Sequence, residues 1–156
     1  MYIALYAVAV AIMVGLDQFT KHLVLSFLTA GQPVTVIPGL VQFRYVENTG
    51  MAFSMFSDKT WLLALFTAVV LAVCIVLLLM GKVEGKLKQF AFLLIIAGGA
   101  GNLIDRVMRH SVVDFIEFTF THFAVFNVAD IFVTIGAGLL ILILFLELFQ
   151  EEKHGE

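Results

Sequence analysis

The sequence predicts an all-α integral membrane protein with four transmembrane helices and a small β-sheet at one membrane face. Of the 156 residues, 62% are hydrophobic and 13% are charged, whereas a soluble domain of this size carries about a quarter charged residues. The mean hydropathy of +1.06 agrees with this class. Four hydrophobic runs alternate with polar connections, and the polar residues that would be costly in lipid gather beside one end of the runs.

Each hydrophobic run is predicted to cross the bilayer as a helix, which takes about 20 apolar residues. The run 61–80 contains no charged residue. The uncharged parts of the first and third runs are shorter than about 20 residues, so we expect their polar ends, Asp17 and Asn102, to lie near the lipid headgroups. Within one membrane-embedded domain, 1–156, the predicted spans are about 2–27, 61–80, 90–104 and 128–149.

The connections between the spans predict orientation and outer structure. The short connection 81–88 carries three lysines, and cytoplasmic loops are enriched in Lys and Arg, so both termini are expected in the cytoplasm. Residues 41–47 alternate apolar and polar, as half-exposed strands do. Residues 115–123 alternate again. We therefore expect a small sheet resting on the outer membrane surface, with aromatic side chains facing lipid.

Two aspartates, Asp114 and Asp130, are the strongest candidates for chemistry. Asp114 ends the connection that leaves the third span and Asp130 opens the fourth, which predicts the same depth on the outer face. Two neighbouring carboxyls do not both ionise easily, so one can act as an acid and the other as a base in peptide hydrolysis. A structural interpretation competes, because Asn127 and Asp130 match a helix capping box and Asp114 could simply end a strand.

A second group of candidates closes the third span. Gly98 permits close helix approach in lipid, and Asn102, Asp105 and Arg106 follow on adjacent turns. An Asp beside an Arg usually forms an ion pair, so we expect Arg106 to pair with Asp105 or with Asp17. The alternative is that Arg106 and Asn102 hold a substrate carbonyl or orient the two acids.

Two further motifs are short and polar. Asp17 and Lys21 are spaced i, i+4 on one helix face, which predicts local charge neutralisation near the interface. Asn48 and Gly50 predict a turn in an outer connection. For Asn48 the alternative is a polar group presented to a bound peptide backbone.

Other chemistry is not supported. The four histidines have no recognised ligand spacing, and no H-E-x-x-H or G-x-S-x-G motif occurs, so no metal site, cofactor, zinc protease or serine hydrolase is predicted. No basic stripe suggests a nucleic-acid partner. Two other functions remain open on the residues alone: a small proton-coupled transporter, and a lipid-binding scaffold that uses intramembrane carboxylates.

Five ordered motifs carry a resemblance over nearly the whole chain. They are D-Q-x-T-K at 17–21, N-x-G-x-A-F at 48–53, G-x-x-G-N-x-x-D-R at 98–106, V-V-D-F at 112–115 and F-N-x-A-D at 126–130. In this order they closely resemble the lipoprotein signal peptidase (signal peptidase II) family of bacterial membrane aspartic proteases. One departure is His110, where the family usually has Gly. Glycine often supplies a turn that other residues resist, so we expect the loop before Asp114 to differ in shape.

The resemblance implies a specific activity and site. The family cleaves diacylglyceryl-modified prolipoproteins before the lipidated cysteine and is inhibited by globomycin. The resemblance implies that Asp114 and Asp130 are the catalytic pair and that they lie at the extracytoplasmic face of the bacterial cytoplasmic membrane. It also implies an outer β-cradle and a short outer helix. The residues implied to bind substrate or support the site are Asp17, Lys21, Asn48, Gly98, Asn102, Asp105, Arg106, Asn127 and Ala129.

Overall fold

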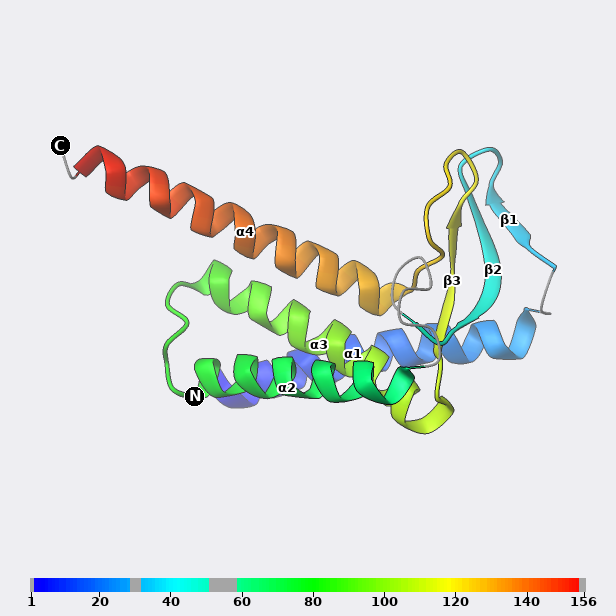
Figure 1. The fold of residues 1–156 in the computed structure, drawn as a ribbon, viewed down its shortest axis with the longest axis horizontal. Coiled ribbons are helices and arrows are strands. Elements are labelled where there is room, and N and C mark those ends of the chain that lie inside the picture. The colour runs from blue at the N-terminus through cyan, green and yellow to red at the C-terminus, as the bar shows by residue number, and fades with distance from the viewer. Residues whose placement is uncertain (1, 29–31, 51–58, 155–156) are drawn as a thin grey trace.

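The described residues form four long helices and one three-stranded sheet (Figure 1). The structure is a computed structural model that describes residues 2–28, 32–50 and 59–154. All four helices are long and apolar enough to cross a membrane, so the predicted fold class is confirmed. In chain order the elements are α1 (Tyr2–Phe27), β1 (Val34–Ile37), β2 (Val41–Asn48), α2 (Thr60–Leu79), α3 (Lys86–Arg109), β3 (Val112–Phe118) and α4 (Val128–His154).

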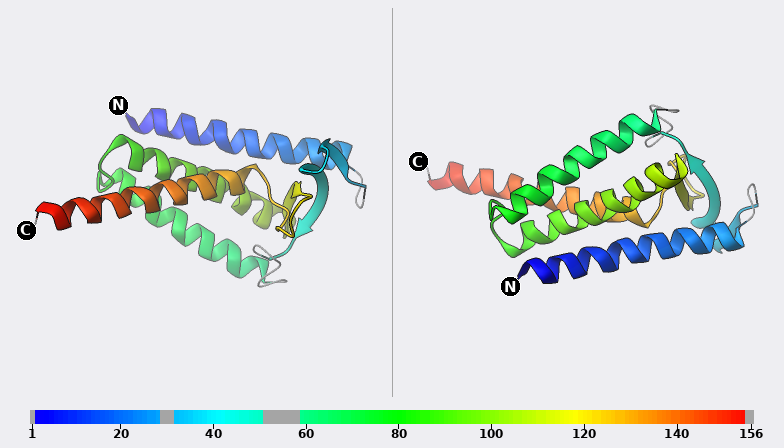
Figure 2. Two further views of the ribbon diagram at one scale, coloured as in Figure 1. Left: turned by 90° about the horizontal axis from the view of Figure 1, so that it is seen from above. Right: turned by 90° about the horizontal axis from the view of Figure 1, so that it is seen from below.

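The helices lie side by side, and the sheet lies across one end of them (Figures 1 and 2). Both ends of the chain and the connection between α2 and α3 lie at the opposite end. α4 diverges from the other helices toward its C-terminal end. Because helices that span a bilayer run across it, a sheet at one end of the bundle lies at one membrane surface.

α3 is the central helix and contacts the other three. Of its membrane-spanning window 44% is buried, against 6–11% for the other helices, whose apolar side chains face outward. Small residues allow this packing, as is usual between helices in lipid. A Cβ added to Gly98 would collide with the carbonyl oxygen of Ala129 on α4, and one added to Gly136 would lie 2.8 Å from the carbonyl oxygen of Ala91.

The sheet is antiparallel, in the order β1-β2-β3. β2 and β3 pair so that Asn48 lies opposite Val112. A small core of Val24 from α1 with Val113 and Phe115 from β3 holds the sheet against the end of α1. This core fixes the height of β3 above the bundle.

Several boundaries differ from the predicted ones. The helix that contains the span predicted at 90–104 is longer than that span, because the polar residues on both sides continue α3 to Lys86 and Arg109. The strand predicted at 115–123 is wrong in its bounds, since β3 covers Val112–Phe118, and Asp114 therefore lies within the strand and not at its end. β1 was not predicted, because four exposed residues give no usable alternation. The short outer helix implied by the resemblance is not among the residues that the structure describes.

The last turn of α3 ends at His110 in an unusual backbone conformation. His110 has φ 60° and ψ 11°, in the left-handed region, which residues with a Cβ resist. The turn before β3 therefore has the geometry that favours glycine, although a histidine occupies it.

Candidate active site

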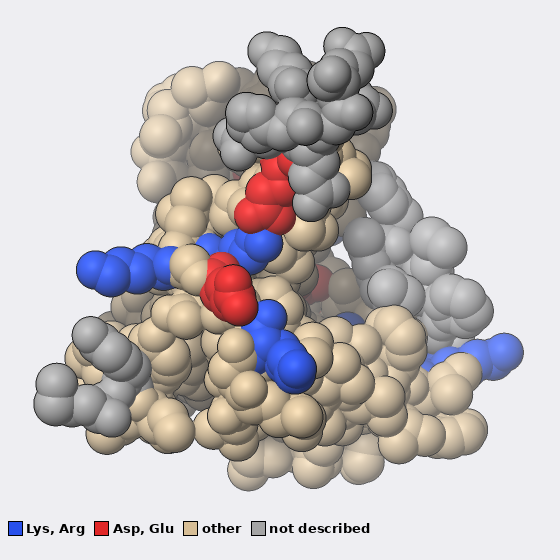
Figure 3. Space-filling view, turned by 90° about the vertical axis from the view of Figure 1, so that its left-hand side faces the viewer, with Lys and Arg blue, Asp and Glu red and all other residues tan. Residues whose placement is uncertain are grey.

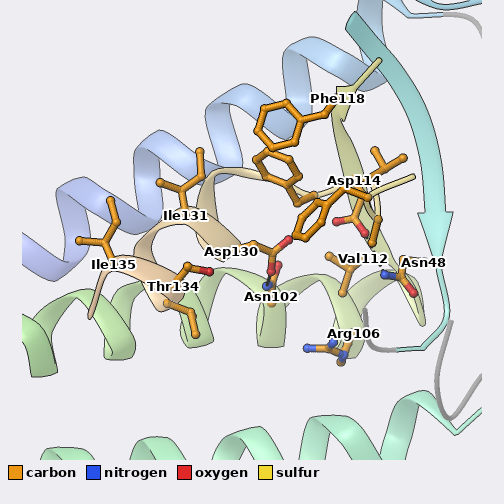
Figure 4. A pocket seen from close by; sticks show the side chains of 15 residues that line it. Asn48, Asn102, Arg106, Val112, Asp114, Phe118, Asp130, Ile131, Thr134 and Ile135 are labelled. Atoms are coloured by element: carbon orange, nitrogen blue, oxygen red, sulfur yellow. Dashed lines mark hydrogen bonds between the residues drawn. The ribbon is translucent and has the colours of Figure 1, made fainter. Parts of the chain in front are cut away.

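A pocket of about 420 Å³ lies between β3, the end of α3 and the first turns of α4 (Figure 4). Its lining has two parts. We call one part the polar end, formed by Asn48, Asn102, Arg106, Asp114 and Asp130. We call the other the apolar wall, formed by Phe118, Phe123, Phe126, Ile131 and Ile135. The five residues of the polar end were all singled out from the sequence, so the fold gathers them into one site.

β3 places Asp114 in the polar end, with 2% of its surface exposed. Its carboxyl accepts hydrogen bonds from Asn48 Nδ2 at 2.9 Å and from Asn127 Nδ2 at 2.6 Å. Burial, and then the charge of nearby Asp130, raise the pKa of Asp114 to about 7, although both amide hydrogen bonds act in the opposite direction. Asp114 can therefore carry a proton near neutral pH, as a general acid must.

Asp130 is held by the first turn of α4. The Asp130 backbone nitrogen donates to Asn127 Oδ1 at 2.9 Å, and the Asn127 backbone nitrogen donates to Asp130 Oδ2 at 3.0 Å. The predicted capping box is therefore confirmed. The other carboxylate oxygen of Asp130 accepts a hydrogen bond from Asn102 Nδ2 at 2.8 Å. The carboxylate therefore accepts two hydrogen bonds, one of them from a backbone nitrogen at the N-terminus of α4, and both act in favour of its ionised form.

Asn127 joins the two aspartates. Its side-chain nitrogen donates to Asp114, its backbone nitrogen donates to Asp130, and its side chain also donates to Asn102 Oδ1 at 3.1 Å. Asn127 is fully buried, so its donors are fixed in direction. The structure thus brings Asp114 and Asp130 together from β3 and α4, and the helix cap itself aims one carboxylate into the pocket.

Behind the polar end, Lys21 of α1 is buried among oxygen atoms. Its Nζ lies 2.9 Å from Asp17 Oδ2, 2.9 Å from Asp105 Oδ2 and 3.0 Å from Asn102 Oδ1. The backbone nitrogen of Ala129 donates to Asp17 Oδ1 at 2.9 Å. The predicted pair of Asp17 and Lys21 is confirmed, but both side chains are buried in the bundle instead of neutralising each other at its surface.

Arg106 does not pair as predicted. The carboxylates of Asp105 and Asp17 are both taken by Lys21, and no ion pair of Arg106 occurs within the described residues. Instead, Arg106 Nη2 donates to the carbonyl oxygen of Gly50 at 3.4 Å. Its Nε is buried and has no hydrogen-bond partner in the described part of the chain. Arg106 thus lines the pocket with a guanidinium that has no carboxylate partner among the described residues.

Asn48 forms the predicted turn and also reaches the site. Its Oδ1 accepts a hydrogen bond from the backbone nitrogen of Gly50 at 2.9 Å, while its Nδ2 donates to Asp114. The predicted turn is therefore confirmed, and the same side chain contacts Asp114, while its presentation to a bound peptide backbone stays a prediction. The last two residues of the motif, Ala52 and Phe53, lie outside the described residues.

Two features of the site were missed from the sequence. Gln18 donates to Asp17 Oδ2, to the Gly101 carbonyl and to Asp105 Oδ1 at 3.1–3.2 Å; its place in the D-Q-x-T-K motif was the only available signal. The apolar wall was also missed. Phe118 and Phe126, whose ring centroids are 5.2 Å apart, look like lipid-facing residues in so hydrophobic a chain.

The polar end suits acid–base chemistry on a polar bond, and the apolar wall suits a substrate that also carries an apolar group. One carboxyl is poised to hold a proton and the other to accept one, with amide and guanidinium donors beside them. Among the residues whose side chains the structure describes, no cluster of three or more His, Cys, Asp or Glu could hold a metal ion.

Comparisons with known proteins agree with this chemistry. The model of the family described as signal peptidase (SPase) II matches residues 9–146. Lipoprotein signal peptidases of Streptococcus pyogenes serotypes M5 and M18 are each 38% identical to the chain over 151 residues, which is 97% of this chain and 97% of each relative. Two solved structures described as a bacterial membrane enzyme, determined by the in meso method at 2.3 and 1.9 Å resolution, are 30% identical to it, with TM-scores of 0.87 and 0.83. They cover 93% and 92% of this chain and 90% and 94% of their own chains.

Proposed function

Because this chain belongs to the signal peptidase II family, we propose that it is a membrane aspartic endopeptidase that removes the signal peptide from diacylglyceryl-modified prolipoproteins. The cut falls before the lipidated cysteine of the substrate. The observation that carries this proposal is the meeting of Asp114 and Asp130 in a pocket that is polar at one end and apolar along one wall. In this proposal residues 1–156 form one membrane-embedded peptidase domain.

Asp130 and Asp114 take the roles of base and acid. Ionised Asp130 accepts a proton from a water molecule held between the two carboxyls, and the resulting hydroxide attacks the carbonyl carbon before the cysteine. Protonated Asp114 hydrogen-bonds the developing oxyanion and gives its proton to the leaving nitrogen. The products are the carboxyl end of the signal peptide and the free amine of the lipidated cysteine. The raised pKa of Asp114, caused first by burial, supports this division.

The surrounding side chains orient the acids and the peptide. Asn102 and Asn127 fix the two carboxyls through their hydrogen bonds, and Lys21 in turn holds Asn102. Arg106 and Asn48 present nitrogen donors at the polar end, where they bind carbonyl oxygens of the substrate backbone. Asp17, Asp105, Gly98 and Ala129 support the site through the charges and the close packing that hold α1, α3 and α4 together.

The apolar wall binds the lipid part of the substrate. Acyl chains that lie along Ile131 and Ile135 are already surrounded by hydrocarbon in the bilayer, so little of their surface is removed from water. Their contact with the wall therefore mainly sets the depth of the scissile bond. Inhibition by globomycin is expected at the same pocket.

The orientation follows from charge. Lys82, Lys86 and Lys88 lie at the end of the molecule far from the pocket, and Figure 3 views that end with its basic and acidic side chains. Short basic loops remain in the cytoplasm. The termini, at the same end, are then cytoplasmic, and the site faces the outside of the bacterial cytoplasmic membrane.

Neither other function is favoured. A proton-coupled transporter needs ionisable groups along a path through the bundle, whereas the buried acids gather at one end. A lipid-binding scaffold has no need of a carboxyl whose pKa is raised to about 7 beside a second one.

The deciding experiment is a cleavage assay on a purified prolipoprotein, with and without its diacylglyceryl group. Asp114→Asn and Asp130→Asn should each lower turnover by about 10²- to 10⁴-fold, the usual contribution of a general acid or base. Glu117→Gln is the matched control, since Glu117 is a carboxylate on β3 that pairs with Arg44 outside the pocket. Normal turnover by either folded aspartate variant, or equal cleavage of unlipidated substrate, would overturn the proposal.

A further inference from the structure

One hydroxyl lies among the side chains of the apolar wall. Thr134, one helical turn beyond Asp130 on α4, lines the pocket next to Ile131 and Ile135. In Figure 4 its hydroxyl points in the direction of the Asp130 and Asn102 side chains. Because a helix rises 1.5 Å per residue, Thr134 sits roughly 6 Å further along α4 than Asp130, away from the polar end.

The Thr134 hydroxyl differs from other hydroxyls on the spanning helices. Thr67 donates back to the Leu63 carbonyl at 2.8 Å, and Ser26 donates to the His22 carbonyl at 2.9 Å. No hydrogen bond of the Thr134 side chain to any described residue is found. At membrane depth a polar group without a partner is costly. The site is therefore suited to an acceptor that the substrate brings.

We propose that the Thr134 hydroxyl donates a hydrogen bond to an ester carbonyl of the substrate's diacylglyceryl group. This inference rests on the proposed function. With the scissile bond between Asp114 and Asp130, the thioether and glyceryl carbons lead away from the polar end. The ester carbonyls are the first strong acceptors beyond the peptide, and the acyl chains after them match the apolar wall. Thr134 thus recognises the ester linkage, while its neighbours bind only hydrocarbon.

The test pairs a change in the enzyme with a change in the substrate. Two synthetic lipopeptides are compared at one fixed ratio of substrate to detergent. One carries ester-linked palmitoyl chains on its glyceryl group, and the other carries ether-linked hexadecyl chains, which lack the carbonyl. The enzymes are wild type, Thr134→Val, which removes the hydroxyl but keeps the branched shape, and Thr134→Ser, which restores it. Thr67→Val is the control for losing a membrane hydroxyl remote from the pocket.

The expected result is a coupling between residue and linkage. Wild type should show a KM roughly three- to tenfold lower for the ester than for the ether, the usual effect of one hydrogen bond, with similar kcat. Thr134→Val should lose this preference, whereas Thr134→Ser and Thr67→Val should keep it. Equal KM values for both lipopeptides in wild type, or the same preference in Thr134→Val, would overturn the assignment of Thr134 while leaving the peptidase intact. No cleavage of either lipopeptide by wild type would overturn the proposed function itself.

Discussion

The surroundings of Asp114 have opposing effects on the pKa of its carboxyl. Burial and the charge of Asp130 favour the protonated carboxyl, whereas hydrogen bonds from Asn48 and Asn127 favour the ionised one. The balance leaves the pKa at about 7, well above the ordinary range of an aspartate. A carboxyl in this state gives up its proton within the physiological pH range.

The first prediction concerns pH. Activity should fall as pH rises through about 7, because ionised Asp114 can no longer donate a proton. Asn48→Ala removes a hydrogen bond that lowers this pKa, so the falling limb should move to higher pH even if the maximal rate drops. The measurement is kcat/KM against pH for both proteins. A limb that stays in place in Asn48→Ala would contradict the assignment of the proton to Asp114.

His110 carries a backbone cost that a glycine would not. Its φ of 60° is the left-handed conformation, which costs a residue with a Cβ about 1–2 kcal/mol. His110→Gly should therefore raise the free energy of unfolding by about 0.5–1 kcal/mol, once the greater freedom of glycine in the unfolded chain is subtracted.

The control for that substitution is Met108→Gly, at an exposed position with helical backbone in the last turn of α3. It should lower stability by up to about 1 kcal/mol, the cost of glycine in a helix interior. Unfolding in detergent, followed by circular dichroism, measures both variants. If His110→Gly destabilised the protein as much as Met108→Gly, the backbone strain at His110 would not be real.

At the scale of elements, the buried charges around Lys21 join four segments of chain. Lys21 and Asp17 belong to α1 and Asp105 belongs to α3. Asp17 accepts from a backbone nitrogen at the start of α4, and Asp105 accepts from the Val113 nitrogen of β3 at 3.2 Å. These charges therefore hold the two elements that carry Asp114 and Asp130 against α1 and α3.

Removing the charge of Lys21 should strongly lower the stability of the folded protein. Lys21→Met would remove the buried counter-charge that Asp17 and Asp105 share, leaving Asp105 only its 4.0 Å ion-pair contact with Arg109 among the described residues, and breaking a buried ion pair typically costs about 3–5 kcal/mol. Lys88→Met is the matched control, because the ion pair of Lys88 with Glu147 is partly exposed and such pairs contribute about 0–1 kcal/mol. Thermal unfolding in detergent compares them. Equal stability losses in the two variants would contradict a special role for Lys21.

Most elements, and three local contacts of the site, could be predicted from the sequence: the Asp17–Lys21 pair, the helix cap at Asn127 and the turn at Asn48. Apolar runs of bilayer length identify the helices because lipid demands them. The ends of α3 were predicted poorly, since its polar termini continue the helix outside that rule. The partner of Asp105 was predicted wrongly, because Arg106 is adjacent in sequence whereas Lys21 arrives only when α1 packs on α3. Four-residue β1 is defined by pairing with β2 and not by its own pattern.

For the whole molecule, the position of the site relative to the membrane is open to a direct test. In a Cys74→Ser background, Thr119→Cys places a thiol beside the end of β3 and Glu84→Cys places one in the connection between α2 and α3. A membrane-impermeant maleimide should label the Thr119→Cys protein in intact cells. It should label the Glu84→Cys protein only after permeabilisation. Labelling of both proteins in detergent is the control, and the reverse pattern in cells would invert the proposed orientation.

The apolar wall determines which measure of substrate concentration governs the reaction rate. Ile135 lines the pocket yet is 53% exposed on a helix that faces hydrocarbon, so the pocket has a side open to the bilayer. A lipidated chain that arrives by this side diffuses in a plane. The concentration that governs the reaction is then the number of substrate molecules per area of membrane, and not the number per volume of solution. In micelles the matching quantity is the mole fraction of substrate in detergent, so added detergent alone should slow the reaction at constant molarity.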